Sequence, residues 1–166
     1  IVTRLVVGNE VLLRRDMSPG ALGEVLAYAK QRSPVPVTYA DVWEFWLRHA
    51  QLAQHVDIVT VHILPYWEDD PVAVGDAVAH VLSTAQKVQT SFTGKPVWVG
   101  ETGWPAAGRQ RAGAVPGRVE QARFLRELLL RTSGSAGAAL DYNFIEAFDQ
   151  PWKRSFEGAM GGYWGL

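Results

Sequence analysis

Apolar residues along this chain gather into short continuous runs and into longer, more spaced segments. The continuous runs predict strands at residues 4–7, 35–39, 57–63, 97–99 and 140–145. Between them lie segments that predict helices, most with apolar residues three and four positions apart, at residues 22–29, 43–56, 78–85 and 122–129. Strands that alternate with helices indicate an α/β fold with a parallel sheet, whose apolar strands are buried on both faces. Both a doubly wound sheet and a (β/α)8 barrel fit this order.

Capping and breaking residues support these boundaries. Ser18 followed by Pro19 is typical of a helix start, with serine as the cap and proline at the first helical position. Gly94 and Pro96 end the third helix, and the small residues at 134–137 predict a loop. Because the chain begins with Ile1, inside a run that already resembles a strand, we expect a missing N-terminal part that would carry any targeting signal.

Composition excludes several classes of function. The 16 basic residues balance 17 acidic ones, which argues against nucleic-acid binding as the main role. The chain has no cysteine, so it forms no disulfide or thiolate metal site, and no His or carboxylate spacing resembles a metal site. No glycine-rich nucleotide motif occurs, so we expect neither a metal nor a cofactor. The seven tryptophans must pack in the core or bind something flat.

Two glutamates occupy equivalent places in this pattern. Glu10 and Glu101 each follow an apolar strand directly, and each has a glycine one or two residues before it. Both carboxylates should therefore project from strand ends at one face of the sheet. Such a pair suits cleavage of a glycosidic bond, because one carboxyl group protonates the leaving oxygen while the other attacks the anomeric carbon. The alternative for any single glutamate at a strand end is an exposed or salt-bridged surface residue.

Four segments resemble motifs of a known family. V-G-N-E at 7–10 and V-G-E-T-G-W-P at 99–105 resemble the two signature motifs of glycoside hydrolase family 17, the β-1,3-glucanases and β-1,3-glucanosyltransferases. Residues 142–153 resemble its last-strand motif. The ending G-G-Y-W-G-L at 161–166 resembles the bacterial branch, in which a glucan synthase domain often shares the polypeptide. The resemblance spans essentially the whole chain, and G-E-T-G-W-P is its most specific part.

The resemblance implies a (β/α)8 TIM barrel of which residues 1–166 form the C-terminal portion, supplying about strands four to eight, with strands one to three absent. It implies that Glu10 is the acid/base at the end of strand four and that Glu101 is the nucleophile at the end of strand seven. Asn9 would bind the 2-hydroxyl of the sugar next to the scissile bond. Plant members have a glutamate near the position of Gln150, so a charged role there is in doubt.

Position and resemblance together single out further candidates for substrate binding. His62 would point into the cleft and bind a hydroxyl or tune Glu101, and Tyr39 would be a donor close to this nucleophile. The alternative for His62 is a hydrogen-bonded core histidine. Tyr66 and Trp67 would form a stacking platform for glucose rings.

Residues nearer the C-terminus complete the predicted site. Trp104 and Trp152 would line the cleft, or else pack within their loops. Lys153 would bind a sugar hydroxyl or pair with Glu157, and Glu146 would bind substrate or orient a neighbour. We assign Trp98 to the core, and His49, His55 and His80 to the surface.

The leading hypothesis is a retaining glycosidase or transglycosylase acting on β-1,3-glucan or its oligosaccharides, located in the periplasm or at the membrane of a bacterium. Expected partners are the missing barrel segment and a membrane glucan synthase domain in the same polypeptide. One alternative is a non-catalytic glucan-binding domain attached to such a synthase. Another is a retaining hydrolase of the same barrel clan that acts on a different β-glycan.

Overall fold

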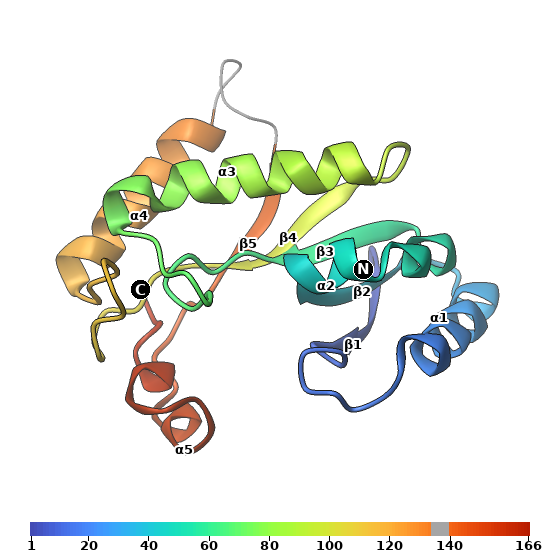
Figure 1. Ribbon diagram of the computed structural model, residues 1–166, viewed down its shortest axis with the longest axis horizontal. Coiled ribbons are helices and arrows are strands. Elements are labelled where there is room, and N and C mark those ends of the chain that lie inside the picture. The colour runs from blue at the N-terminus through green and yellow to red at the C-terminus, as the bar shows by residue number, and fades with distance from the viewer. Residues whose placement is uncertain (134–139) are drawn as a thin grey trace. The chain divides into compact units, whose positions relative to one another are not determined.

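The computed structural model describes residues 1–133 and 140–166, and it confirms the predicted alternation of strands and helices. Figure 1 shows the elements in chain order from blue to red. The strands are β1 (Leu5–Asn9), β2 (Val37–Val42), β3 (Ile58–His62), β4 (Val97–Thr102) and β5 (Asp141–Phe144). The α-helices are α1 (Pro19–Arg32), α2 (Trp43–Arg48), α3 (Val74–Ser91), α4 (Arg118–Thr132) and α5 (Arg154–Glu157). The described residues also form the 3-10 turns η1 (Ala50–His55), η2 (Pro151–Lys153) and η3 (Ala159–Gly162). The loop predicted at 134–137 lies outside the described residues.

The strands follow one another across the sheet in chain order, from β1 to β5. β1 pairs with β2 and β2 with β3, and both pairs are parallel. This arrangement confirms the α/β class. β2 is buried along nearly its whole length, as predicted, but Leu5 and Val6 of β1 are half exposed. Burial on both faces is therefore seen for β2 but not for β1, the first strand of this sheet.

The chain divides into two compact units. The first contains residues 1–62 and 84–100, and the second contains residues 63–83 and 101–166. β4 passes from the first unit to the second between Gly100 and Glu101. None of the described helices is both long enough and apolar enough to span a bilayer.

The first unit has a core of aliphatic and aromatic side chains. Ser18 caps α1 by accepting a hydrogen bond from the Ala21 N–H at 3.3 Å, as the sequence predicts, and Leu22 and Leu26 are buried. The predicted apolar face is wrong at Val25, which is 43% exposed because the buried stripe of α1 is narrower than the apolar one.

The predicted helix over 43–56 is also wrong in its length. It breaks at His49, whose backbone leaves the helical region, and continues as η1. Within α2, the Trp46 indole donates a hydrogen bond to the Thr60 carbonyl at 2.7 Å, and its ring packs edge-on against Phe92. Trp98, predicted as core, is half-buried, and its ring lies 4.3 Å from the guanidinium carbon of Arg4.

The second unit has a core rich in aromatic rings, centred on Trp104. The Trp104 ring stacks on Phe124 and meets the edge of Tyr66 at 5.8 Å between centroids. α4 buries Gln121, Phe124 and Leu128. The predicted apolar face, which ran through residues 122 and 129, is therefore displaced by about one position from the buried one. The amphipathic pattern misplaces it because the buried face includes a polar residue.

Candidate functional site

Glu10 follows β1 at a sharp change of backbone direction. Gly8 has φ +86° and Glu10 has φ +52°. Both backbone conformations lie in the left-handed region, which residues other than glycine rarely adopt. A Cβ atom on Gly8 would also lie 3.0 Å from a methyl group of Val11. The Glu10 N–H donates to the Ala40 carbonyl at 2.8 Å, which ties the turn to β2. The glycine before this glutamate is therefore a requirement of the local fold.

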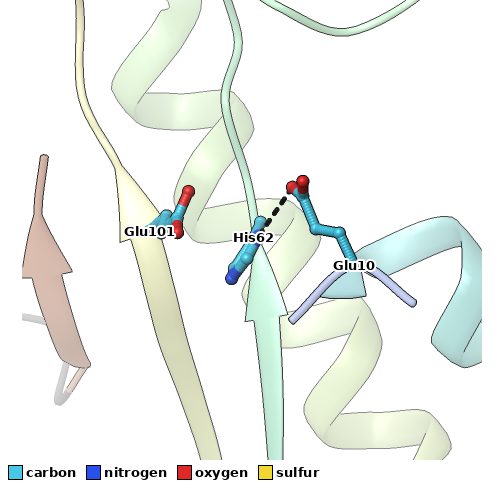
Figure 2. A group of neighbouring side chains, drawn as sticks. All are labelled: Glu10, His62 and Glu101. Carbon is cyan, nitrogen blue, oxygen red and sulfur yellow. Dashed lines mark hydrogen bonds and ion pairs between the residues drawn. The ribbon is translucent and has the colours of Figure 1, made fainter. Parts of the chain in front are cut away.

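The Glu10 side chain is paired with His62, which ends β3. Figure 2 shows the two side chains, and the distance from His62 Nδ1 to Glu10 Oε1 is 3.0 Å. His62 is only 2% exposed, whereas the Glu10 side chain is 24% exposed. A buried imidazole thus holds one oxygen of a carboxyl group that solvent still reaches. The sequence predicts a functional His62 that contacts sugar or Glu101, and the structure brings it to Glu10.

Tyr39 lies in the interior of β2 and contacts the turn after Glu10. Its hydroxyl donates to Asp41 and accepts a hydrogen bond from the Leu12 N–H at 3.0 Å. Burial, reinforced by the bond to Asp41, raises the pKa of the Tyr39 hydroxyl well above its usual range. In this structure the single O–H proton of Tyr39 is donated to Asp41, and the prediction that Tyr39 lies close to the nucleophile stays a prediction.

Glu101 belongs to the second unit and lies in β4 (Figure 2). Its carbonyl accepts a hydrogen bond from the Ile63 N–H at 3.0 Å, so the residue is part of the strand ladder. The preceding Gly100 packs against the first unit's Thr60, where a Cβ atom would lie 2.6 Å from the threonine methyl group. The glycine of this motif therefore lets β4 lie close to its neighbour.

A second glycine of the same motif has a comparable role. A Cβ atom on Gly103 would lie 2.2 Å from the Ile145 carbonyl oxygen, far inside van der Waals contact. The Ile145 N–H in turn donates to the Thr102 carbonyl at 2.8 Å. G-E-T-G thus combines a glutamate with two glycines that permit close packing on both sides of β4.

Two predicted binding aromatics are core residues. Tyr66 and Trp104 are both 0% exposed, so neither offers a ring face to a sugar. The Tyr66 hydroxyl donates to the Arg109 carbonyl, and the Trp104 indole donates to the Val115 carbonyl at 3.0 Å. The predicted roles of these two residues are wrong because both the ring and the polar atom are used inside the fold. Trp67 is half-buried and stacks on Tyr66.

The residues after β5 form a small polar cluster with one exposed ring beside it. Lys153 Nζ lies 2.8 Å from Glu146 Oε2, and the Gln150 amide donates to the same oxygen. Glu146 thus contacts two of its neighbours, which fits its predicted role of orienting a neighbour, and Lys153 pairs with Glu146 in this structure. Trp152 is 63% exposed, so its ring is available to a ligand.

The remaining predicted residues lie at or near the surface. Asn9 is exposed at the end of β1. His49 and His55 are half-buried, and His80 Nε2 lies 2.9 Å from Glu68 Oε2. All three histidines keep part of their surface exposed, which agrees with the surface prediction.

The sequence analysis missed two buried polar residues, one in each unit. Asp41 is fully buried beside Tyr39, and its signal in the sequence is a lone acid inside an apolar strand, two positions from a tyrosine. Gln121 is buried on α4, and its signal is a polar residue three and seven positions before Phe124 and Leu128.

Comparison with known proteins assigns this chain to a family. The BtgE/BtgC glycoside hydrolase domain matches residues 1–165. The glucan 1,3-beta-glucosidase of Schizosaccharomyces pombe is 30% identical over 92% of this chain and 50% of its own length. The family 17 beta-1,3-glucanosyltransferase from Rhizomucor miehei superposes with a TM-score of 0.84 at 28% identity, over 99% of this chain and 59% of that one. An active-site mutant of the same enzyme, in complex with laminaritriose, gives a TM-score of 0.85.

These matches confirm the resemblance to glycoside hydrolase family 17 and the fold of part of its barrel. The chain spans 50% of the length of the Schizosaccharomyces pombe relative and 29% of the length of the probable beta-glucosidase btgE of Aspergillus fumigatus. The relatives are fungal, so they lend no support to the bacterial branch. Glu10 and Glu101 both lie inside the matched range, and the chain belongs to the BtgE/BtgC glycoside hydrolase domain family.

Proposed function

We propose that the enzyme containing this chain is a retaining β-1,3-glucan hydrolase or transglycosylase, with Glu10 as the acid/base and Glu101 as the nucleophile. The observation that carries the proposal is that a glycoside hydrolase family match covers both strand-end glutamates. The matched relatives from fission yeast and Rhizomucor, named for β-1,3-glucosidase and β-1,3-glucanosyltransferase activities, support the substrate class.

In the first step Glu101 attacks the anomeric carbon while the bond to the leaving glucan oxygen breaks. The proton of the Glu10 carboxyl group passes to that oxygen, and a glycosyl ester forms on Glu101. Retention requires the two carboxyl groups to be about 5–5.5 Å apart in the working enzyme. The pairing of Glu10 with His62 supports this role, because the contact fixes the orientation of the carboxyl group.

In the second step an acceptor hydroxyl attacks the same carbon, Glu10 takes the proton of that hydroxyl, and the ester bond to Glu101 breaks. Water as the acceptor gives hydrolysis, and a second glucan gives transfer. Asn9 is proposed to bind the 2-hydroxyl of the reacting sugar, which its exposed position at the end of β1 allows. The exposed Trp152 and the half-buried Trp67 are proposed to bind glucan rings by stacking.

Substitution of each glutamate in the complete enzyme tests the assignment. Glu10→Ala and Glu101→Ala are each expected to reduce turnover of laminari-oligosaccharides by about 10²-fold or more. Glu24→Ala, on an exposed position of α1, is the matched control and should leave turnover unchanged. Near-native turnover by the Glu101 variant would show that the nucleophile lies elsewhere.

Product analysis at high substrate concentration decides between hydrolysis and transfer. Chains longer than the starting oligosaccharide identify a transglycosylase, whereas shorter chains alone identify a hydrolase. Tight laminarin binding with no product over long incubation would instead support the non-catalytic glucan-binding domain.

Bacterial origin, a periplasmic or membrane-associated location, and a membrane glucan synthase domain in the same polypeptide stay predictions from the C-terminal motif. The absence of strands one to three of the barrel from residues 1–166 stays a prediction as well. Fractionation of the source cell, with an antibody against this chain, tests the location and the size of the whole polypeptide.

A further inference from the structure

The turn that follows Glu10 begins with backbone N–H groups that need acceptors. The Arg14 N–H donates to the Glu10 carbonyl at 2.9 Å, and the Asp16 N–H donates to the Val11 carbonyl at the same distance. The chain thus makes one helix-like turn directly after the glutamate. As at the start of any helix, the first N–H groups of this turn, those of Leu12 and Leu13, have no partner within the turn.

Asp41 supplies the missing acceptor from the neighbouring strand. One of its carboxylate oxygens accepts from the Leu12 N–H at 3.2 Å and from the Leu13 N–H at 3.4 Å. Its other oxygen accepts from the Val42 N–H at 2.8 Å. Asp41 is 0% exposed. Burying a carboxylate costs much free energy unless hydrogen-bond donors surround it, and these N–H groups are such donors.

Tyr39 completes the connection between the strand and the turn. It lies two residues before Asp41, so both side chains project from the same face of β2. The tyrosine hydroxyl donates to the Asp41 carboxylate and accepts from the Leu12 N–H. Two buried side chains therefore hold the turn that fixes the unusual backbone conformation of Glu10.

We propose that Tyr39 and Asp41 are positioning residues that hold Glu10 in place for proton transfer. This inference rests on the proposed role of Glu10 as the acid/base. Neither side chain needs to touch the substrate. Their effect runs through the turn, while the contact with His62 holds the carboxyl group from the other end of the side chain.

Asp41→Asn tests this role because it keeps the shape of the side chain while replacing an acceptor oxygen with an N–H donor. Tyr39→Phe, which removes only the hydroxyl group, is the milder second variant. Asp57→Asn is the matched control, because the Asp57 carboxylate also accepts a backbone N–H of β2, from Val37 at 2.8 Å. All three are made in the complete enzyme, with Glu10→Ala as the reference for loss of the acid/base.

Two substrates separate positioning from general destabilisation. Laminari-oligosaccharides have a leaving oxygen that needs a proton, whereas a dinitrophenyl β-laminarioside has a leaving group that departs without one. For the Tyr39 and Asp41 variants, we expect kcat/KM on the oligosaccharide to fall about 10- to 100-fold and kcat/KM on the aryl substrate to change less than about threefold. Azide, a nucleophile that needs no general base, should restore kcat on the aryl substrate.

The Asp57 control should keep the ratio of the two kcat/KM values. An equal fall on both substrates in the Tyr39 and Asp41 variants, or no fall at all, overturns the positioning role. If Asp41→Asn does not fold, Tyr39→Phe alone decides in the same way. If Glu10→Ala itself lacks the selective loss, the proposed function fails, and that result is distinct from a failure confined to the two positioning variants.

Discussion

The side chain of Gln121 joins three carbonyl groups inside the second unit. Its amide nitrogen lies 3.0 Å from the Trp104 carbonyl oxygen, 3.3 Å from that of Trp164 and 3.0 Å from that of Gly165. Trp104 belongs to the V-G-E-T-G-W-P motif, and the other two residues belong to the C-terminal G-G-Y-W-G-L segment. Gln121→Leu keeps a similar volume on α4 but removes every one of these hydrogen bonds.

The expected cost follows from counting protons and acceptors. An amide has two N–H protons, so it makes two good hydrogen bonds here and shares the third, longest one. The Trp164 carbonyl also accepts from the Glu146 N–H at 3.0 Å, so it stays satisfied in the variant. Losing the bonds to one buried and one partly buried carbonyl, at about 1–2 kcal/mol each, lowers the free energy of unfolding by about 2–4 kcal/mol.

Urea unfolding of the complete enzyme, followed by tryptophan fluorescence, measures this loss. The midpoint should fall while the dependence on urea concentration stays the same. Gln86→Leu, on an exposed position of α3, makes the identical change and should stay within about 0.5 kcal/mol of the parent. A loss below about 0.5 kcal/mol for Gln121→Leu would refute the reasoning from buried hydrogen bonds.

Three further changes have defined outcomes. Gly103→Ala places a methyl group 2.2 Å from the Ile145 carbonyl oxygen and should cost at least about 1–3 kcal/mol of stability in the same urea assay; an unchanged midpoint would contradict it. Burial raises the pKa of Asp57, but its hydrogen bonds and the charge of Lys30 outweigh this, so the folded-state pKa is lowered. Its contribution to stability is therefore present above the unfolded pKa and lost as pH falls through the folded one, so the gap between parent and Asp57→Asn should be wider at about pH 7 than at about pH 3, and an equal gap would count against it. Trp152→Ala should lower the ratio of transfer to hydrolysis products if its ring binds the acceptor glucan. The melting temperature should not change, since the ring is 63% exposed. An unaltered product ratio would show that Trp152 does not bind the acceptor.

The elements were predictable from local physics. Ser18 with Pro19 predicts the start of α1, and the apolar runs before Glu10 and Glu101 predict β1 and β4. These features depend on residues that are neighbours in the chain, so they can be predicted from a single sequence. The length of the second helix does not follow in this way, because no glycine or proline marks its break at His49.

The burial of aromatic residues was much harder to predict. Trp104 and Trp152 both follow strand ends in motifs that suggest a cleft, yet the first is fully buried and the second is exposed. Their sequence surroundings do not distinguish them, because the difference lies in which helix covers the loop. Phe124 of α4 stacks on the Trp104 ring.

The buried polar residues were also not predicted from the sequence. Asp41 and Gln121 each satisfy backbone groups that are distant in the chain, so no local pattern announces their partners. An acid in an apolar strand and a glutamine in an apolar helix face are nevertheless visible in the sequence. Such residues are expected to donate or accept hydrogen bonds with buried backbone groups, because burying a polar group without a hydrogen-bond partner is too costly.

Trapping of the glycosyl-enzyme tests the central claim most directly. The complete enzyme is incubated with a 2-deoxy-2-fluoro laminarioside that carries a good leaving group, and the labelled peptide is identified by mass spectrometry. The account predicts one covalent sugar on Glu101, formed by the parent and by Glu10→Ala but not by Glu101→Ala. A sugar attached to any other residue, or product of inverted configuration with no covalent adduct, would contradict it.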